Sequence, residues 1–195
     1  GYSTTDYYQV DKRFGSNALY KQLSKEAAKR GLGIVKDLVL NHIGSGHWWM
    51  DDLPSKDWLN HQNKYVQTNH IHETVFDPYV TKAQKDLFTD GWFVETMPDL
   101  NQRNPLVSKY FIQNALWWIE FANLAGLRVD TYPYSDKDFM GDWTQAIMEE
   151  YPNFNRLKVS KFALIAKNNT EKFRFIGSIL LLTIYRLAMI SKSIN

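Results

Sequence analysis

Two segments of the chain place chemically useful side chains at the end of a short apolar stretch. In the first, residues 126–130 read Gly-Leu-Arg-Val-Asp, so that Arg128 stands two residues before Asp130. Side chains of a strand alternate between its two faces, and Arg128 and Asp130 therefore share one face. A guanidinium beside a carboxyl group lowers its pKa and keeps it ionised, as a carboxylate nucleophile requires. An ion pair that only stabilises a core would use the same spacing, which leaves both interpretations open.

The second segment, residues 34–42, is mostly aliphatic and ends in Asn41 and His42. Asp37 and Asn41 fall on the same face of the predicted strand. Polar residues at the C-terminal ends of barrel strands point into the active-site mouth, which makes this face a candidate site. His42 could hydrogen-bond a ligand hydroxyl there, and an ordinary solvated loop histidine would fit the position equally well.

The histidines gather in one part of the chain, between residues 42 and 72. His70 and His72 alternate in the way that two metal ligands on a strand would. The chain has no cysteine, and no acidic triad accompanies these two histidines. A zinc-type site needs such further ligands, so we do not favour a metal at this pair.

The elements that must position these side chains alternate between helices and strands. The patterns predict strands over residues 33–41 and 127–130, and helices over 16–30, 105–124 and 137–150. Such an order favours βαβ units with a parallel sheet, and the fold class is therefore α/β. We expect the two strands to be adjacent and parallel, with the first two helices packed outside them.

The ends of the predicted helices carry recognisable signals. Ser16 is a suitable N-cap for the first helix, and Asn104 followed by Pro105 is a suitable start for the second. We expect Gly126 to end the second helix. In the first helix, a four-residue spacing of apolar side chains predicts one buried stripe, made of Leu19, Leu23 and Ala27.

Composition indicates a soluble globular chain, with 44% apolar and 23% charged residues among 195. The charge is uneven, because residues 156–195 hold eight Lys or Arg and one acidic residue. This basic segment has no stacking motif or dense basic run, so nucleic acid is not an expected partner.

The apolar run over residues 175–185 is too short for a membrane span, which needs about 20 residues. No signal-peptide pattern follows Gly1.

Four motifs in order resemble signatures of the α-amylase family of glycoside hydrolases, glycoside hydrolase family 13. Along the chain they are the loop over residues 1–16, Asp-Leu-Val-Leu-Asn-His at 37–42, Met-Pro-Asp-Leu-Asn at 97–101, and Gly-Leu-Arg-Val-Asp at 126–130. The resemblance covers residues 1 to about 155 and points in particular to the neopullulanase and cyclomaltodextrinase-like branch. It implies part of a (β/α)8 TIM barrel with an irregular subdomain inserted after the third barrel strand.

The resemblance also implies domain boundaries and one missing residue. Residues 1–41 and 105–155 match barrel segments, residues 42–104 match the inserted B-type subdomain, and residues 156–195 match nothing in the family. We expect that last segment to be divergent or non-native, for example through a frame change, although residues 162–166 could form the fifth barrel strand. The general acid/base glutamate of the third signature should follow Asn155, and none is found there.

Roles follow from the resemblance position by position. Asp130 matches the nucleophile and Arg128 the arginine that orients it. Substrate contacts are implied for Tyr2, His42 and Asp37. Asn41 matches a calcium ligand of many members, whereas Asn101 stands where calcium-binding members have aspartate. No cofactor is required by this chemistry, and calcium is a candidate ion that favours carboxylate ligands.

The function that these roles imply is a retaining α-glucan hydrolase for starch-type or pullulan-type oligosaccharides. Retaining enzymes need two carboxyl groups, and only one is found here. We therefore expect this chain to be an incomplete and inactive fragment of such an enzyme, whose parent would be periplasmic or extracellular. The alternatives are a carbohydrate-binding remnant and a non-catalytic amylase-fold scaffold. A scaffold is expected to lose the nucleophile, which Asp130 preserves.

Overall fold

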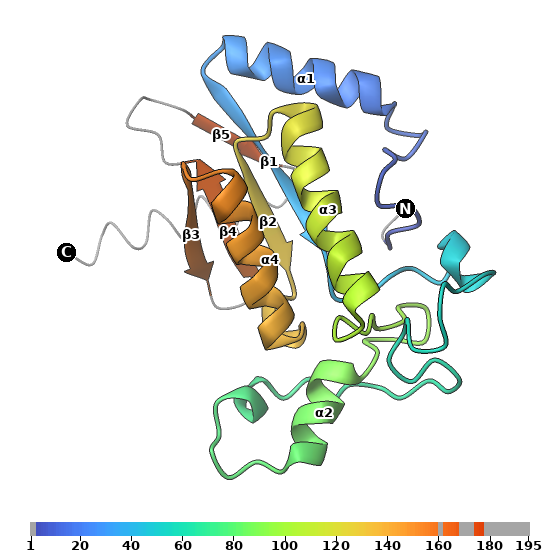
Figure 1. Cartoon of the computed structure of the whole chain (residues 1–195). Helices are drawn as coiled ribbons and strands as arrows, with labels where there is room; N and C mark the ends of the chain where they lie inside the picture. The colour runs from blue at the N-terminus through green and yellow to red at the C-terminus, as the bar shows by residue number, and fades with distance from the viewer. Residues whose placement is uncertain (1–2, 160–161, 168–173, 178–195) are drawn as a thin grey trace.

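A mixed β-sheet forms the centre of the computed structural model, which describes residues 3–159, 162–167 and 174–177 (Figure 1). The strands follow the order β3-β4-β2-β1-β5 across the sheet. Their bounds are β1 Leu32–Val39, β2 Gly126–Asp130, β3 Phe154–Val159, β4 Phe162–Lys167 and β5 Arg174–Gly177. The arrangement is therefore α/β, as the sequence predicts.

The two strands of the candidate site lie side by side. β1 and β2 pair in parallel, with Asp37 opposite Arg128 and Val39 opposite Asp130. The connection between them contains helices. A parallel pair needs such a crossover, because the end of the first strand and the start of the second lie at opposite ends of the sheet. The predicted adjacency and direction of these two strands are confirmed.

The rest of the sheet departs from a barrel. β4 pairs antiparallel with both β2 and β3, whereas β5 pairs parallel with β1. All strands of a (β/α)8 barrel are parallel, so residues 162–167 do not form the fifth barrel strand. The lack of barrel neighbours also predicts unpaired edges on β1 and β2. Among the described residues this is wrong for β2, which pairs on both sides, and for the first half of β1, because β5 pairs with residues 32–35 of β1 only.

Three helices cover one face of the sheet, as Figure 1 shows. They are α1 Asn17–Lys29, α3 Pro105–Ala122 and α4 Lys137–Glu150. Ser16 caps α1 by accepting a hydrogen bond from Leu19 N, and Asn104 caps α3 by accepting one from Leu106 N. Both caps agree with the sequence prediction, because each side-chain oxygen satisfies an amide with no partner inside the helix.

Two helix predictions are wrong in detail. Of the predicted stripe, Ala27 is buried, but Leu19 and Leu23 are 57% and 56% exposed, and α1 buries Ser24 with Ala27. Small side chains on that face let the helix approach its neighbours closely, and apolar spacing alone cannot distinguish the two faces. The second helix ends at Ala122 rather than at Gly126, because Asn123 adopts a left-handed backbone with φ of 46°. Asparagine tolerates that conformation well.

The core lies between the sheet and these helices. Leu38, Leu127 and Val129 point to the helical side, where they join a cluster that includes Phe111 and Trp118. Lys36 has the same orientation as Leu38, and its Nζ lies 4.1 Å from the centre of the Trp118 ring. Burial lowers the pKa of Lys36 to about 8. The opposite face of β1 and β2 is therefore free to carry Asp37, Arg128 and Asp130.

The segment between β1 and α3 extends beyond the C-terminal ends of β1 and β2 (Figure 1). It contains the 3-10 helices η1 Trp48–Met50 and η2 His72–Val75 and the helix α2 Lys82–Asp90. Sequence patterning misses α2, although Thr81 and Gln84 form a capping box that marks its start. No helix in the described part of the chain is long and apolar enough to cross a membrane.

Candidate active site

Arg128 lies between two carboxylates at the end of the β1–β2 pair. Its Nη2 donates a hydrogen bond to Asp130 Oδ1 at 2.9 Å, and its Nη1 donates one to Asp37 Oδ2. The second contact follows from the strand register, which places Asp37 directly opposite Arg128. The Arg128 side chain is only 11% exposed, whereas that of Asp130 is 33% exposed. The arginine is thus enclosed while the candidate nucleophile remains accessible.

The environment of Asp37 differs from that of an ordinary surface carboxylate. Burial raises the pKa of Asp37, and the nearby charge of Asp130 raises it further, while Arg128 opposes both effects. One oxygen of Asp37 is buried without a hydrogen-bond partner among the described residues. A single guanidinium therefore serves two carboxylates, and this arrangement fixes its plane relative to Asp130.

His42 lies just after the end of β1, and its side chain is near the carboxylate of Asp130. Its side chain is buried, and this burial lowers the pKa of His42 to about 4, although the negative charge of Asp130 opposes the shift. Its ring meets Phe93 edge to face at 5.0 Å, and Tyr7 Oη donates a hydrogen bond to its backbone oxygen at 2.9 Å. His42 is therefore a neutral imidazole at neutral pH, able to hydrogen-bond an uncharged hydroxyl.

The carboxyl group of Asp99 ties the long segment back to the end of β1. Its two oxygens accept hydrogen bonds from Asn41 Nδ2 and Asn60 Nδ2, each at 2.8 Å. Asp99 is 1% exposed, and burial raises its pKa well above the usual value although both amides favour the charged form. Residues 42 and 99 also form an isolated antiparallel bridge.

These contacts bear on the predicted calcium site. Asn41 uses its amide nitrogen on Asp99, whereas Asn101 donates to the backbone oxygen of Asp57 at 2.9 Å. Within the described ranges, no group of three or more His, Cys, Asp or Glu is placed to hold a metal ion. Calcium prefers six to eight oxygens with carboxylates among them, and the amide-rich set around Asn41 fits it poorly.

Thr131, directly after Asp130, is a feature that sequence reasoning misses. Its φ of 49° and ψ of 33° lie in the left-handed region, which is an outlier for a β-branched residue. Such strain costs about 1–3 kcal/mol and concentrates at functional sites. The turn begins the 3-10 helix η3 Tyr132–Tyr134. No local sequence signal identifies it, because asparagine or glycine would be expected there.

Tyr134 connects this turn to the segment before α3. Its ring stacks on Phe88 of α2 at 4.1 Å and meets His72 at 5.3 Å, with Tyr134 Oη 3.4 Å from His72 Nε2. His70 stacks on Phe93, the residue that also contacts His42. The two histidines therefore belong to an aromatic cluster beside the nucleophile turn.

Two residues that bear on the rest of the site lie outside the described residues: Tyr2, and Glu171, the one acidic residue of the segment after Asn155. β4 is antiparallel to both β2 and β3, so β3 runs in the same direction as β2. The C-terminal end of β3 therefore lies at the same end of the sheet as Asp130. That strand contains no acidic residue. Glu149 and Glu150 are exposed at the end of α4, toward the opposite edge.

Comparisons with known proteins show which family the chain belongs to. The family described as alpha amylase, catalytic domain, matches residues 1–176, which extends beyond the motifs noted above. Intracellular maltogenic amylase of Bacillus subtilis is 35% identical over 153 residues, 78% of this chain and 24% of its own length. Neopullulanase 2 of Thermoactinomyces vulgaris is 28% identical over 152 residues, 78% of this chain and 25% of its own length.

Solved structures give the same result. An α-amylase of Geobacillus thermoleovorans, complexed with acarbose, is 34% identical with a TM-score of 0.62, covering 76% of this chain and 30% of that one. An Anoxybacillus α-amylase is 32% identical with a TM-score of 0.63 and the same coverage. The chain belongs to the α-amylase family of glycoside hydrolases. It spans about a quarter of the length of the curated relatives it matches.

Proposed function

We propose that this chain supplies the nucleophile side of the active site of a retaining α-glucan hydrolase. The observation that carries the proposal is the position of Arg128, hydrogen-bonded to both Asp37 and Asp130 at the ends of two adjacent parallel strands. A retaining glycosidase needs an ionised carboxylate that attacks the anomeric carbon. Asp130 is accessible and held by a fixed positive charge, as that role requires.

Each neighbour of Asp130 has a task in this proposal. Arg128 orients the nucleophile, and Asp37 holds Arg128, which is a different role from the sugar contact that the motif implies. Neutral His42 hydrogen-bonds a hydroxyl of the sugar whose bond is cleaved. By resemblance alone, Tyr2 stacks on that same sugar.

The segment over residues 42–104 serves in this proposal as the inserted B-type subdomain. Support comes from its attachment at both ends, through the hydrogen bond from Asn41 to Asp99 and the bridge between residues 42 and 99. A segment fixed in this way beyond the strand ends can form one wall of a substrate site. The relatives' names, maltogenic amylase and neopullulanase, support starch-type or pullulan-type oligosaccharides as substrates.

An activated substrate tests the nucleophile without a general acid. In a 5-fluoro-α-maltosyl fluoride, an oxygen of Asp130 attacks the anomeric carbon while the bond to fluorine breaks and fluoride leaves with the electron pair. No proton is needed for that departure. The expected product is a stable glycosyl ester on Asp130, found by peptide mass spectrometry.

Two variants control this experiment. Asp130→Asn should give no adduct, because an amide is a poor nucleophile. Asp142→Asn removes an exposed carboxylate from α4 and should label like the parent chain. An adduct on another residue, or one that persists in Asp130→Asn, contradicts the proposal.

A further inference from the structure

The side chain of Gln102 joins the chain after β1 to the turn after β2. Its Nε2 donates a hydrogen bond to the backbone oxygen of Leu40 at 2.8 Å, and its Oε1 accepts one from the backbone N–H of Asp136 at 2.9 Å. Gln102 is only 5% exposed, so both bonds are shielded from water. A single buried amide thus uses its donor and its acceptor on two segments that are far apart in the sequence.

The turn that Gln102 reaches begins directly after the candidate nucleophile. Pairing of β1 with β2 ends at Asp130, and Thr131 leaves the strand with a left-handed backbone. Tyr134 N donates to the backbone oxygen of Thr131 at 3.0 Å, which closes the turn on itself. A strained conformation persists only where its surroundings hold it, and the far end of this turn is Asp136, the N-cap of α4. The hydrogen bond to Gln102 holds that end.

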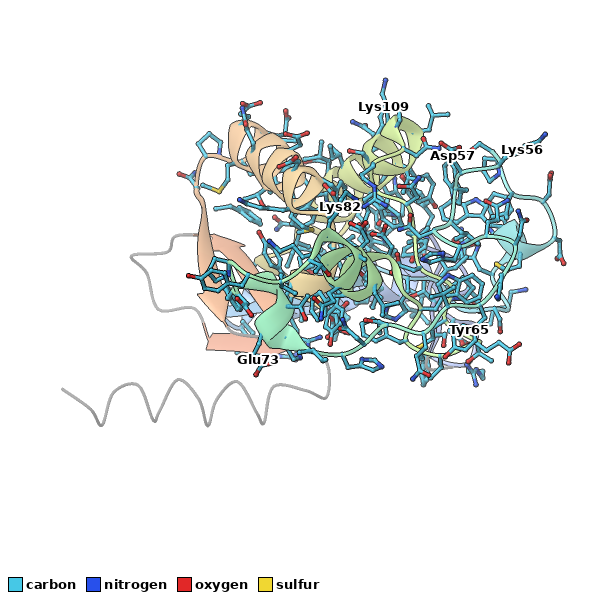
Figure 2. All side chains as sticks on the ribbon, turned by 90° about the horizontal axis from the view of Figure 1, so that it is seen from below. Lys56, Asp57, Tyr65, Glu73, Lys82 and Lys109 are labelled. Carbon is cyan, nitrogen blue, oxygen red and sulfur yellow. The ribbon has the colours of Figure 1, made fainter. Side chains whose placement is uncertain are left out.

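Gln102 is itself fixed in place from the end of β1. Leu100 N donates to the backbone oxygen of Asn41 at 2.9 Å, and Gln102 N donates to Leu100 O at 3.0 Å. The side chain therefore starts from a backbone that is already tied to the chain just after β1. Figure 2, seen from this end of the sheet, labels Glu73 of η2 and Lys82 of α2 in the long segment, of which Gln102 is a part.

We propose that Gln102 is a positioning residue for the nucleophile, which fixes the turn over residues 131–136 and through it the direction of the Asp130 carboxylate. This rests on the proposed function, because Asp130 is the nucleophile assigned there. Arg128 holds the carboxylate from its own strand, whereas Gln102 holds the backbone that follows it. Misplacing a reacting group by about 1 Å can cost about 10²-fold in rate, so loss of this anchor should slow the attack.

The test measures how fast 5-fluoro-α-maltosyl fluoride labels Asp130 as the reagent is raised to saturation. Gln102→Met removes both hydrogen bonds but nearly keeps the length of the side chain, and should lower the maximal labelling rate about tenfold or more. The half-saturating concentration should stay within about twofold, because the proposed sugar contact is His42. Gln102→Glu keeps an oxygen that accepts from Asp136 N and should restore most of the maximal rate.

Trp143→Phe is the matched control for a change in stability alone. Trp143 is fully buried, and its Nε1 donates to the backbone oxygen of Phe111 at 3.2 Å, between α4 and α3. The variant also removes a buried bond from a side chain to the backbone, but about two helical turns from Asp136. It should lower the urea midpoint and leave the maximal labelling rate unchanged. Equal slowing by Trp143→Phe and Gln102→Met at equal stability would overturn the proposal.

Amide hydrogen exchange gives a second readout that does not depend on labelling. In Gln102→Met the amides of Tyr134 and Asp136 should exchange about tenfold faster or more, whereas those of β2 should not change. A parent chain that is not labelled defeats the proposed function, and exchange then decides whether Gln102 holds the turn. Unchanged exchange in Gln102→Met defeats the role of Gln102 even where Asp130 of the parent is labelled.

The labelling kinetics can also overturn the proposal. An unchanged maximal rate in Gln102→Met would do so, and so would an effect confined to the half-saturating concentration, which would place Gln102 in sugar binding. If Gln102→Met does not fold, Gln102→Asn takes its place. That variant keeps the amide but is one methylene too short to reach both Leu40 and Asp136, so the same slowing is expected.

Discussion

The side chain of Asn41 donates a hydrogen bond to the buried carboxyl group of Asp99, 58 residues further along the chain. This contact joins the end of β1 to the end of the long segment that follows it. Asn41 belongs to one family motif and Asp99 to another, and the fold brings them together. The two motifs therefore form one structural unit beside the candidate nucleophile.

Asp99 should make stability depend on pH. Its pKa is raised in the folded state, so the folded chain binds more protons than the unfolded chain above pH about 4. The contribution of Asp99 is thus complete below the unfolded pKa and is lost as pH rises toward the folded pKa. The difference in unfolding free energy between the parent and Asp99→Asn should shrink as pH rises from 4, in urea titrations. A constant difference would contradict this.

His42 should behave in the opposite direction. Burial lowers its folded pKa to about 4, against about 6.5 when unfolded. The unfolded chain therefore binds more protons between these values, and stability is lost as pH falls from about 6.5 to about 4. NMR titration should show the His42 ring titrating near 4, and His42→Gln should remove its part of the acid sensitivity. A midpoint near 6.5 would show that the ring is solvated.

Arg128→Lys should slow labelling of Asp130 far more than it perturbs the fold. Lysine keeps the charge but lacks the fork that reaches both Asp37 and Asp130. Misplacing a reacting group by about 1 Å can cost about 10²-fold in rate, which is the decrease expected. Asp37→Asn is the comparison, because it retains the contact between Arg128 and Asp130 and should slow labelling less. Equal effects of the two variants would argue against a special role of the fork.

Starch, pullulan and cyclodextrin should not be hydrolysed at a useful rate by this chain alone. Their leaving oxygen needs a proton, and a positioned general acid contributes about 10²–10⁴ in rate. β3 carries no acidic residue to the edge where Asp130 lies. The assay compares the parent chain with Asp130→Asn. Turnover that disappears in the variant would reveal an acid elsewhere in the chain.

Calcium should not stabilise the chain. Asn41 and Asn101 donate through their amide nitrogens to Asp99 and to the backbone of Asp57, so each could offer calcium only a neutral amide oxygen and neither supplies a carboxylate. The thermal midpoint should therefore be the same in EDTA and in millimolar calcium. Asn101→Asp restores a charged ligand and should gain a calcium-dependent increase, because binding to the folded state alone raises stability. A calcium-dependent midpoint in the parent would establish the predicted ion.

The sequence by itself determined the elements of the site and their order. Alternation along residues 126–130 places Arg128 and Asp130 on one face, and caps such as Asn104 mark where helices begin. These are local properties, since side-chain direction and capping depend on residues a few positions apart. The parallel pairing of β1 with β2 also follows, because a helix-containing connection permits it.

Tertiary structure alone decided which distant groups meet. Asp37 reaches Arg128 across 91 residues only through the register of β1 against β2. The antiparallel insertion of β4, the exposure of Leu19 and Leu23, and the left-handed backbone of Thr131 likewise have no local signal. Each depends on what packs against the segment, and packing is a property of the whole fold rather than of neighbouring residues.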